Sequence, residues 1–498
     1  MSPRRESLVT VALFVVCSLA VIVPICLEDF QIGVDTPTHL SILRVMRLAF
    51  EDPSAFHRDY AVRMLQPYWG YYAPTLLLSV VLPLDLSAKL ITGLTLIGIP
   101  IATALIAKRE GLKPIVALPA FALCYNFNFW FGFLPFLSGL VALLFGLLSV
   151  LRYQDSPGWR NLGLLGLVSL GVFASHVIAW LLFGACSAWL LFVRAPRSPL
   201  RAAVIGLFAL VPAALLLLAW SRGVERTAAS NFIVNNPLSH DVAIKAWNLP
   251  HNAFSSIDPT TEFLLLGLWL GLLTLAMAGP VDAARKERCF TWGGLAMAMF
   301  AGYWVVPQDL AGVAFLYERL IMFALLFPLL CVAKRRPFER LMPALSLAMV
   351  ALTLSLSALM FRQFNGEMSG AKTCLAAARP RSNLMGLMLE SGFSSWGQPL
   401  MLHADSYHLY WNLGRVFGHA MDAAPNSLVY YRQQDVFHAL VPTLEWQPLS
   451  YRPAYGKNID YFLIHGPARH DIALLKDTLQ GLDLACEQGQ WRLYSSSM

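Results

Sequence analysis

The sequence predicts an α-helical polytopic membrane protein with about eleven transmembrane helices and a C-terminal α/β domain outside the membrane. Of its 498 residues, 57% are hydrophobic and 13% are charged, which is roughly half the ~25% of charged residues in a typical soluble domain. Long uncharged runs recur from Leu8 to Met360, as expected for membrane spans. The remaining residues, 362–498, have the mixed composition of a small soluble domain.

The apolar runs and the basic loops between them predict a topology. Eleven runs are expected to span the membrane: 8–26, 87–107, 114–127, 133–152, 161–175, 177–194, 202–220, 263–283, 289–305, 318–333 and 341–360. Short basic segments, which favour the cytoplasmic side, lie at 4–5, 108–113, 152–160, 194–201, 285–288 and 334–340. The N-terminus is therefore expected in the cytoplasm and the C-terminal domain outside. These loops account for the net charge of +7, so it does not indicate nucleic acid binding.

One apolar segment, residues 69–83, is shorter than the roughly 20 residues needed to cross. We expect it to lie flat at the outer face, where its Trp and Tyr residues fit the interface. The alternative topology crosses here and merges 161–194 into one span. The favoured topology gives two long outer loops, 27–87 and 221–262, within a membrane module of residues 1–361.

The C-terminal domain, 362–498, carries strand-like segments at 383–389, 461–465 and 491–494 and a helical pattern at 471–480. Cys374 and Cys486 lie in this polar region and can form a disulfide if it is extracytoplasmic. No Cys or His spacing resembles a metal site.

The most informative segment follows the first span and reads GVDTPTHLSILRVMRLAF. Thr36 and Pro37 favour the start of a helix with a broad apolar face, so Asp35 is expected at the hinge between a span and a surface helix. A carboxylate at headgroup level can act as a general base on a lipid-linked substrate. The alternative is that Asp35 only caps the helix.

Other residues of the first outer loop are candidates for substrate binding. His39 lies one turn after Asp35, and Arg58, Asp59 and Arg63 follow further along the loop. The arginines can neutralise a phosphate leaving group, or they can simply anchor the protein at lipid headgroups.

Further candidates lie at the outer ends of later spans. Asn126 and Asn128 lie in an aromatic turn and are expected to face a polar cavity. His176 lies at a helical break, where it either binds substrate or bridges helices. Glu318 and Arg319 begin a span, where they either pair with each other or hold a ligand, with Arg319 on a lipid phosphate.

This arrangement resembles the GT-C glycosyltransferase superfamily, whose members take sugars from polyprenyl-phosphate or polyprenyl-diphosphate donors. The stretch GVDTPTHLSILR is similar to a GxDTPxHL segment of bacterial membrane proteins with this architecture, as are FWFGFLPFLSGL and the ASH break at His176. The resemblance implies that Asp35 is the base or metal-associated acid and that 69–83 is a juxtamembrane helix. Thr36 replaces the second acid of the usual pair, so the metal and any other cofactor stay unknown.

The resulting hypothesis is an inverting glycosyltransferase of a bacterial inner membrane. Its partners would be the bilayer, a polyprenyl-phosphate-sugar donor and a glycan, lipid or protein acceptor, with no nucleic acid. The alternatives are a transporter or flippase of a lipid-linked saccharide, a polysaccharide polymerase or ligase, and a non-catalytic relative. A transporter is expected to carry charged residues near mid-membrane and internal pseudo-symmetry between two halves. Neither feature is evident in this sequence.

Overall fold

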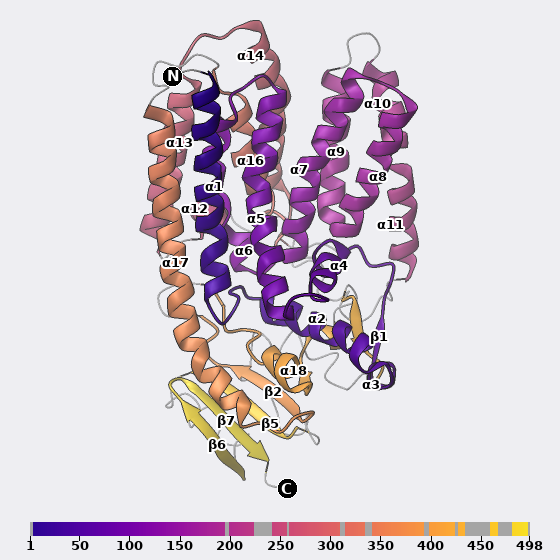
Figure 1. The fold of residues 1–498 in the computed structure, drawn as a ribbon, viewed down its shortest axis with the longest axis vertical. Helices are drawn as coiled ribbons and strands as arrows, with labels where there is room; N and C mark the ends of the chain where they lie inside the picture. Colours follow the sequence, from indigo (N-terminus) through magenta and orange to yellow (C-terminus); the bar gives the residue numbers. More distant parts are fainter. Residues whose placement is uncertain are drawn as a thin grey trace.

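The computed structural model is a long helical bundle with a small sheet domain at one end (Figure 1). It describes residues 3–194, 199–223, 242–255, 258–308, 314–333, 341–392, 398–423, 427–433, 459–466 and 481–496.

Every predicted span coincides with helical structure. Single helices cover most of them: α1 (Pro3–Leu27), α5 (Leu84–Arg109), α7 (Leu134–Asp155), α8 (Trp159–Ser175), α9 (Val177–Val193), α13 (Pro259–Met277), α15 (Gly294–Val305, after the short α14, Ala283–Arg288) and α17 (Leu341–Ala376). The others are built from two shorter pieces each: a 3₁₀ segment (Pro114–Leu123) with α6 (Phe127–Trp130), α10 (Pro199–Phe208) with α11 (Val211–Gly223), and α16 (Ile321–Leu326) with a 3₁₀ turn (Phe327–Leu330). In the described part of the chain, five helices are long and apolar enough to cross a membrane alone.

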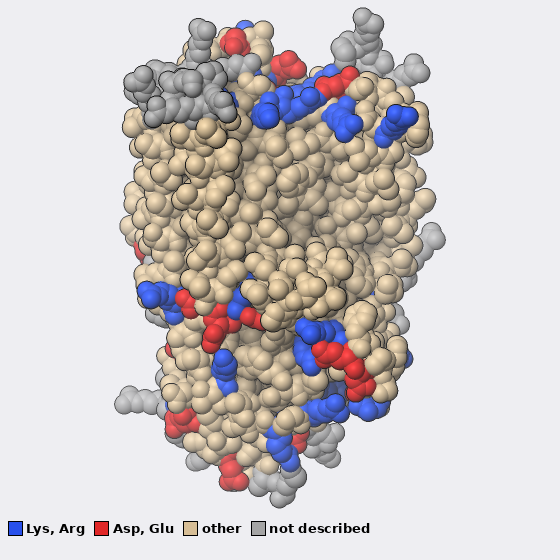
Figure 2. Space-filling model, viewed as in Figure 1, with Lys and Arg blue, Asp and Glu red and all other residues tan. Residues whose placement is uncertain are grey.

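On the face drawn in Figure 2, charged side chains lie toward the two ends of the molecule. Figure 2 shows a broad uncharged belt between an upper row rich in Lys and Arg and a lower, mixed group. Ion pairs join the predicted cytoplasmic loops at one end: Arg109 pairs with Asp155, and Arg194 lies 2.8 Å from Glu110. The belt has the polarity expected of lipid-facing surface.

The first outer loop forms a compact set of short elements at the other end of the bundle (Figure 1). They are α2 (Thr36–Glu51), α3 (Pro53–Asp59), β1 (Tyr60–Val62) and α4 (Trp69–Leu78). The ten residues of α4 are too few to cross, as the sequence predicts. Helix α2 packs between the bundle and α18 (Ser406–Asn412), so it is buried on most of its surface.

The C-terminal region forms a sheet whose described strands are ordered β3-β2-β5-β7-β6. Strand β2 (Asn383–Met388) runs parallel to β3 (Arg415–Phe417) and β5 (Tyr461–His465), while β7 (Trp491–Ser496) is antiparallel to β5 and β6 (Leu482–Gln488). The three predicted strands are confirmed. The predicted helix at 471–480 lies outside the described residues.

Several contacts tie the C-terminal region to the rest of the chain. Helix α17 continues without a break through residue 361 into the domain, and Cys374 on it forms a disulfide with Cys486 on β6. Strand β1 of the first outer loop pairs with β4 (Val429–Tyr431), with Tyr60 opposite Tyr431. The helix α12 (Val242–Phe254), which lies in the second long loop, also contacts the C-terminal region. Its His251 lies 2.7 Å from the side chain of Gln398. The short α19 (Ala420–Ala423) precedes β4.

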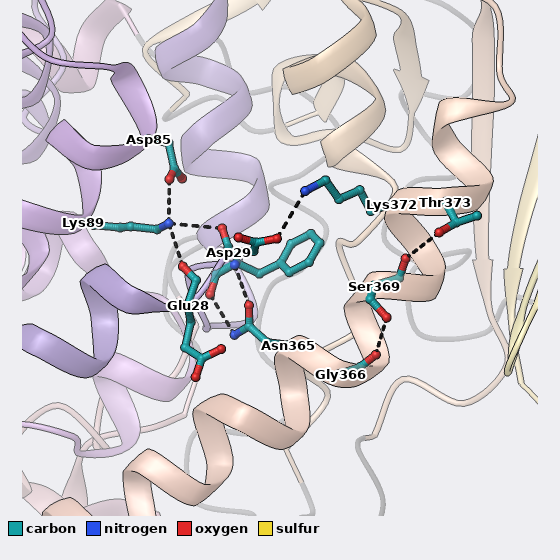
Figure 3. Close-up of polar contacts among 10 residues, drawn as sticks. Glu28, Asp29, Asp85, Lys89, Asn365, Gly366, Ser369, Lys372 and Thr373 are labelled. Atoms are coloured by element: carbon teal, nitrogen blue, oxygen red, sulfur yellow. Dashed lines mark hydrogen bonds and ion pairs between the residues drawn. The ribbon is translucent and has the colours of Figure 1, made fainter.

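The point where the first outer loop leaves α1 is held by hydrogen bonds to α5 and α17 (Figure 3). The buried Lys89 ammonium donates to the Glu28 and Asp29 carbonyls at 2.7 and 3.1 Å and pairs with Asp85 at 2.6 Å. The Asn365 side chain accepts from the Phe30 amide at 2.6 Å and donates to the Phe30 carbonyl at 3.2 Å. These contacts fix the start of the loop that carries Asp35.

Asn365→Ala is expected to lower the free energy of unfolding by roughly 1–3 kcal/mol, because it leaves buried polar groups of Phe30 without a partner. Thermal unfolding in detergent measures this change. The matched control is Ser369→Ala on the same helix, whose exposed hydroxyl bonds only to the nearby Gly366 carbonyl. Equal unfolding temperatures for the two variants would contradict this role for Asn365.

Candidate functional site

The backbone of Asp35 is held against the turn between α6 and α7. The amides of Val34 and Asp35 donate to the carbonyls of Trp130 and Phe131 at 3.0 and 3.1 Å. Asp35 precedes α2, but its side chain makes no capping hydrogen bond. Since 32% of that side chain is exposed, its carboxylate is available to a ligand. The capping alternative is therefore not what the geometry shows.

Two glycines make this close approach possible. Gly132 has a φ of +80° and Gly33 a φ of +134°, a region that favours glycine. A Cβ atom at position 132 would lie 2.7 Å from the Asp35 nitrogen, closer than van der Waals contact permits. The glycines of the two motifs GVDTP and WFGFLP thus fix where Asp35 sits.

A histidine of the C-terminal domain faces Asp35. His403 Nε2 lies 3.4 Å from Asp35 Oδ1, and the imidazole is largely buried. Sequence reasoning did not include His403 in the site. The sequence feature that could have indicated His403 is the histidine-containing segment HADSYHLYWNLGRVFGH. Its spacing does not reveal which histidine contacts the first outer loop.

Two further histidines near Asp35 are held neutral. His39 Nδ1 lies 2.5 Å from the Tyr72 hydroxyl, and burial lowers the pKa of His39 to about 4 despite the opposing effect of Asp35. His419 Nε2 lies 2.6 Å from the Ser41 hydroxyl, and burial, with His403 and His39 nearby, lowers its pKa to about 3. Both histidines stay uncharged at neutral pH.

These lowered pKa values predict acid sensitivity. The unfolded chain binds protons on both histidines below about pH 6.5, whereas the folded chain does so only near their lowered values. Stability is therefore expected to fall as pH decreases from about 6.5 toward 4. The unfolding temperature of a His39→Gln, His419→Gln double variant should depend less on pH between 7.5 and 5 than that of the wild type. Parallel curves would contradict this assignment.

His176 and Arg319 meet at the outer end of α8 and α9. The His176 Nδ1 atom accepts a hydrogen bond from the Ile178 amide at 3.1 Å, so the neutral ring carries its proton on Nε2. That Nε2 lies 3.4 Å from Arg319 Nη1. Two donors facing each other cannot satisfy one another, and an oxygen acceptor between or beside them would satisfy both.

Backbone carbonyls accept hydrogen bonds from two of the three guanidinium nitrogens of Arg319. Its Nε and Nη2 atoms donate to the Phe315 and Ala314 carbonyls, each at 3.2 Å. Among the described residues, no carboxylate forms an ion pair with Arg319. The group is 5% exposed, so this buried cation is costly unless an anion is bound.

Aromatic rings connect this pair with Asp35. The Arg319 guanidinium lies 4.3 Å from the Phe133 ring centre and 4.9 Å from that of Phe136. The Phe133 ring is 5.0 Å from that of Phe131, whose carbonyl binds the Asp35 amide. The structure thus places Asp35, His39, His176 and Arg319 around one turn.

Asn126 and Asn128 have mainly local partners. The Asn126 side chain caps α6 by accepting a hydrogen bond from the backbone N–H of Asn128 at 2.8 Å, and its amide nitrogen donates to the Leu123 carbonyl at 2.8 Å. The side-chain nitrogen of Asn128 donates to Asn126 Oδ1 at 3.0 Å. The buried Oδ1 of Asn128 has no hydrogen-bond partner in the described part of the chain. The sequence predicts that both face a polar cavity, and only Asn128 Oδ1 has spare hydrogen-bonding capacity.

Glu318 lies next to α12 instead of forming an ion pair with Arg319. Its charge acts on Lys245, which is buried and donates to the carbonyls of Tyr303, Trp304 and Val306 at 2.9 to 3.2 Å. Lys245 therefore attaches α12 to the end of α15.

The structure does not bring Arg58, Asp59 or Arg63 to Asp35. Arg58 forms a bidentate pair with Asp59 at 2.9 Å, and both side chains are exposed. Arg63 lies over the Tyr430 ring at 4.3 Å and donates to the Ser427 carbonyl at 3.3 Å. These residues face the C-terminal domain. Among the described residues, no group of three or more His, Cys, Asp and Glu is placed to hold a metal ion.

Comparison with solved structures identifies the fold. No protein-family model and no curated protein matches the chain. The chain is similar to ArnT from Cupriavidus metallidurans in the apo state, at 12% identity, with a TM-score of 0.57 and 97% of each chain covered. The chain therefore has the fold of this ArnT structure. The expectation drawn from the DTPTH segment and the span pattern is thus confirmed for the fold.

Two further solved structures are similar. ArnT bound to undecaprenyl phosphate matches at 14% identity and a TM-score of 0.52, again with 97% of each chain covered. Arabinofuranosyltransferase AftD from Mycobacteria matches at 15% identity and a TM-score of 0.47, with the whole of this chain covering 40% of AftD.

Proposed function

We propose that this chain is an inverting membrane glycosyltransferase that takes a sugar from a polyprenyl-phosphate donor and transfers it to an acceptor in the cell envelope. The observation that carries the proposal is the buried donor pair, His176 Nε2 and Arg319 Nη1, which lie 3.4 Å apart beside the turn whose Phe131 carbonyl accepts a hydrogen bond from the Asp35 amide. A solved structure of ArnT contains undecaprenyl phosphate, which makes this lipid the first donor carrier to test.

The donor phosphate would bind between His176 and Arg319. Each group supplies an N–H donor, and hydrogen bonds from ionised groups to phosphate are about twice as strong as neutral ones. The aromatic rings of Phe133 and Phe136 exclude water around the guanidinium, which strengthens its interaction with an anion. Arg319 would also stabilise the charge of the departing polyprenyl phosphate.

Asp35 would act as the general base. It would take the proton of an acceptor hydroxyl as that oxygen bonds to the anomeric carbon and the bond from this carbon to the phosphate oxygen breaks. The carboxylate is partly exposed and is not needed as a helix cap. His403, 3.4 Å away, would orient the carboxylate and connect the C-terminal domain to the reaction.

We further propose eleven crossings, with residues 1–361 as the membrane module and 362–498 as a periplasmic domain that helps to select the acceptor. The disulfide between Cys374 and Cys486 supports an oxidising compartment for this domain. The basic loops at the opposite end support a cytoplasmic location there. This orientation fits a bacterial inner membrane.

The test uses purified protein in proteoliposomes with a panel of radiolabelled undecaprenyl-phosphate sugars and a cell-envelope extract as acceptor source. We expect the appearance of labelled acceptor together with release of undecaprenyl phosphate. A fluorescent lipid-linked saccharide measures translocation in the same vesicles. Translocation without sugar release would support the flippase alternative and overturn the proposal.

A further inference from the structure

A polar pocket lies between the first outer loop and the C-terminal domain, and Asp35 is not part of its lining. Its volume is about 380 Å³, which is within the usual range for small-ligand sites. The residues that line it are Leu48, Ala55, Arg58, Asp59, Tyr60, Arg381, Asn383, Leu413, Arg415, Tyr431 and Gln433. We propose that this pocket binds a phosphate monoester, through Arg58, Arg381 and Arg415.

The charge of the lining favours an anion. Arg58 comes from α3, Arg381 precedes β2, and Arg415 begins β3, so separate segments of the chain bring their guanidinium groups to one pocket. The carboxylate in the lining, Asp59, is already engaged by Arg58 in a bidentate pair at 2.9 Å. The pocket therefore keeps a net positive charge, and guanidinium groups match phosphate oxygens in geometry.

Arg381 is the strongest candidate to contact a ligand. In the described part of the chain, its exposed guanidinium makes no ion pair or hydrogen bond, although Asp52 lies near enough for a charge interaction. Its backbone has a φ of +59°, which is uncommon for a residue with a side chain. This conformation is held by the Arg381 amide, which donates to the Asn412 carbonyl at 2.9 Å. Strained residues of this kind often mark binding sites.

The remaining wall suits the carbon part of such a ligand. Tyr60 and Tyr431 face each other across the β1–β4 pair, with ring centres 5.2 Å apart. Arg415 is held in place over the Tyr431 ring at 4.7 Å and donates to the Gln433 carbonyl at 3.0 Å. Aromatic faces beside a cationic rim can contact a sugar or glycerol moiety while the arginines hold its phosphate.

The phosphate can belong to a soluble sugar phosphate or to a lipid headgroup, and the residues around the pocket fit either source. Its mouth is polar, while large apolar side chains flank α3, with Phe50, Met64 and Leu65 exposed by 80%, 70% and 60%. Such side chains are expected at a membrane interface. The binding chemistry is the same in both cases, so the two sources are separated by experiment.

The experiment measures phosphate binding to full-length protein in nanodiscs, in an Arg319→Gln background so that the proposed donor site does not contribute. One arm titrates glucose 1-phosphate into phosphatidylcholine nanodiscs by calorimetry. The other detects retained phosphatidic acid by native mass spectrometry in nanodiscs that contain this lipid. Binding in the first arm assigns a soluble ligand, and binding in the second assigns a lipid.

The variants Arg381→Gln and Arg58→Gln alter exposed side chains and are expected to fold normally. Each should weaken binding about 10-fold, the effect of losing one charge-assisted contact. Arg379→Gln is the matched control: its exposed guanidinium pairs with Asp460 at 3.6 Å and is not part of the pocket lining. Its affinity should match that of the parent. Absence of binding in both arms, or equal affinity in all variants, overturns the proposal. Because the readout is binding, it is independent of sugar transfer.

Discussion

Asp35→Asn is expected to reduce sugar transfer by about 10²- to 10⁴-fold, the usual contribution of a positioned general base. The amide keeps the size and most hydrogen bonds of the carboxylate but cannot accept the proton. The side chain does not cap α2, and the backbone is fixed by Trp130 and Phe131, so the variant should fold normally. Transfer from the radiolabelled donor in proteoliposomes measures the effect.

The matched control is Asp29→Asn in the same outer loop. Asp29 is exposed and pairs with Lys372 at 3.3 Å, so its variant should transfer sugar at the wild-type rate (Figure 3). Wild-type transfer by Asp35→Asn would remove Asp35 from the role of base. A comparable loss in both variants would indicate that charge in the loop matters, and not the position of one carboxylate.

Arg319→Gln is expected to weaken binding of undecaprenyl phosphate by about 10- to 100-fold, because each hydrogen bond to a charged group contributes roughly 1.5–3 kcal/mol. Glutamine can still donate one hydrogen bond toward His176 but carries no charge and no fork of donors. Quenching of tryptophan fluorescence by the lipid, or native mass spectrometry, gives the dissociation constants.

Arg44→Gln provides the comparison for this measurement. Arg44 also lies at the outer end, on α2, but its guanidinium pairs with Glu51 at 2.7 Å, so the variant should bind the lipid as the wild type does. Unchanged affinity in Arg319→Gln would show that the donor phosphate binds elsewhere. The unfolding temperatures of both variants establish whether a loss of binding reflects a loss of structure.

Local sequence patterns predicted much of the fold. Uncharged runs mark the helices of the bundle, and the Thr36–Pro37 pair marks the start of α2, because both signals depend on neighbouring residues. The ten-residue α4 and the strands β2, β5 and β7 were predicted on the same basis. Asp35 and His176 were chosen as candidates because a polar group between apolar segments is costly without a role, and the structure places both beside the turn between α6 and α7.

Contacts between distant segments were beyond reach of such patterns. His403 meets Asp35 only because the C-terminal domain packs on α2, and the pairing of Tyr60 with Tyr431 joins two segments far apart in the sequence. The same packing turns Arg58 and Arg63 toward that domain instead of toward Asp35. Asn126 and Asn128 bond to each other at a helix start, which their spacing alone does not distinguish from exposure to a polar cavity.

A cryo-EM structure of the protein with undecaprenyl phosphate tests the central claim most directly. We expect phosphate oxygens within about 3.2 Å of both Arg319 Nη1 and His176 Nε2, with the Asp35 carboxylate facing the same bound headgroup. A lipid phosphate bound elsewhere, with Asp35 more than about 15 Å away, would contradict a shared site, since a catalytic base must lie within hydrogen-bond reach of its substrate or one water away.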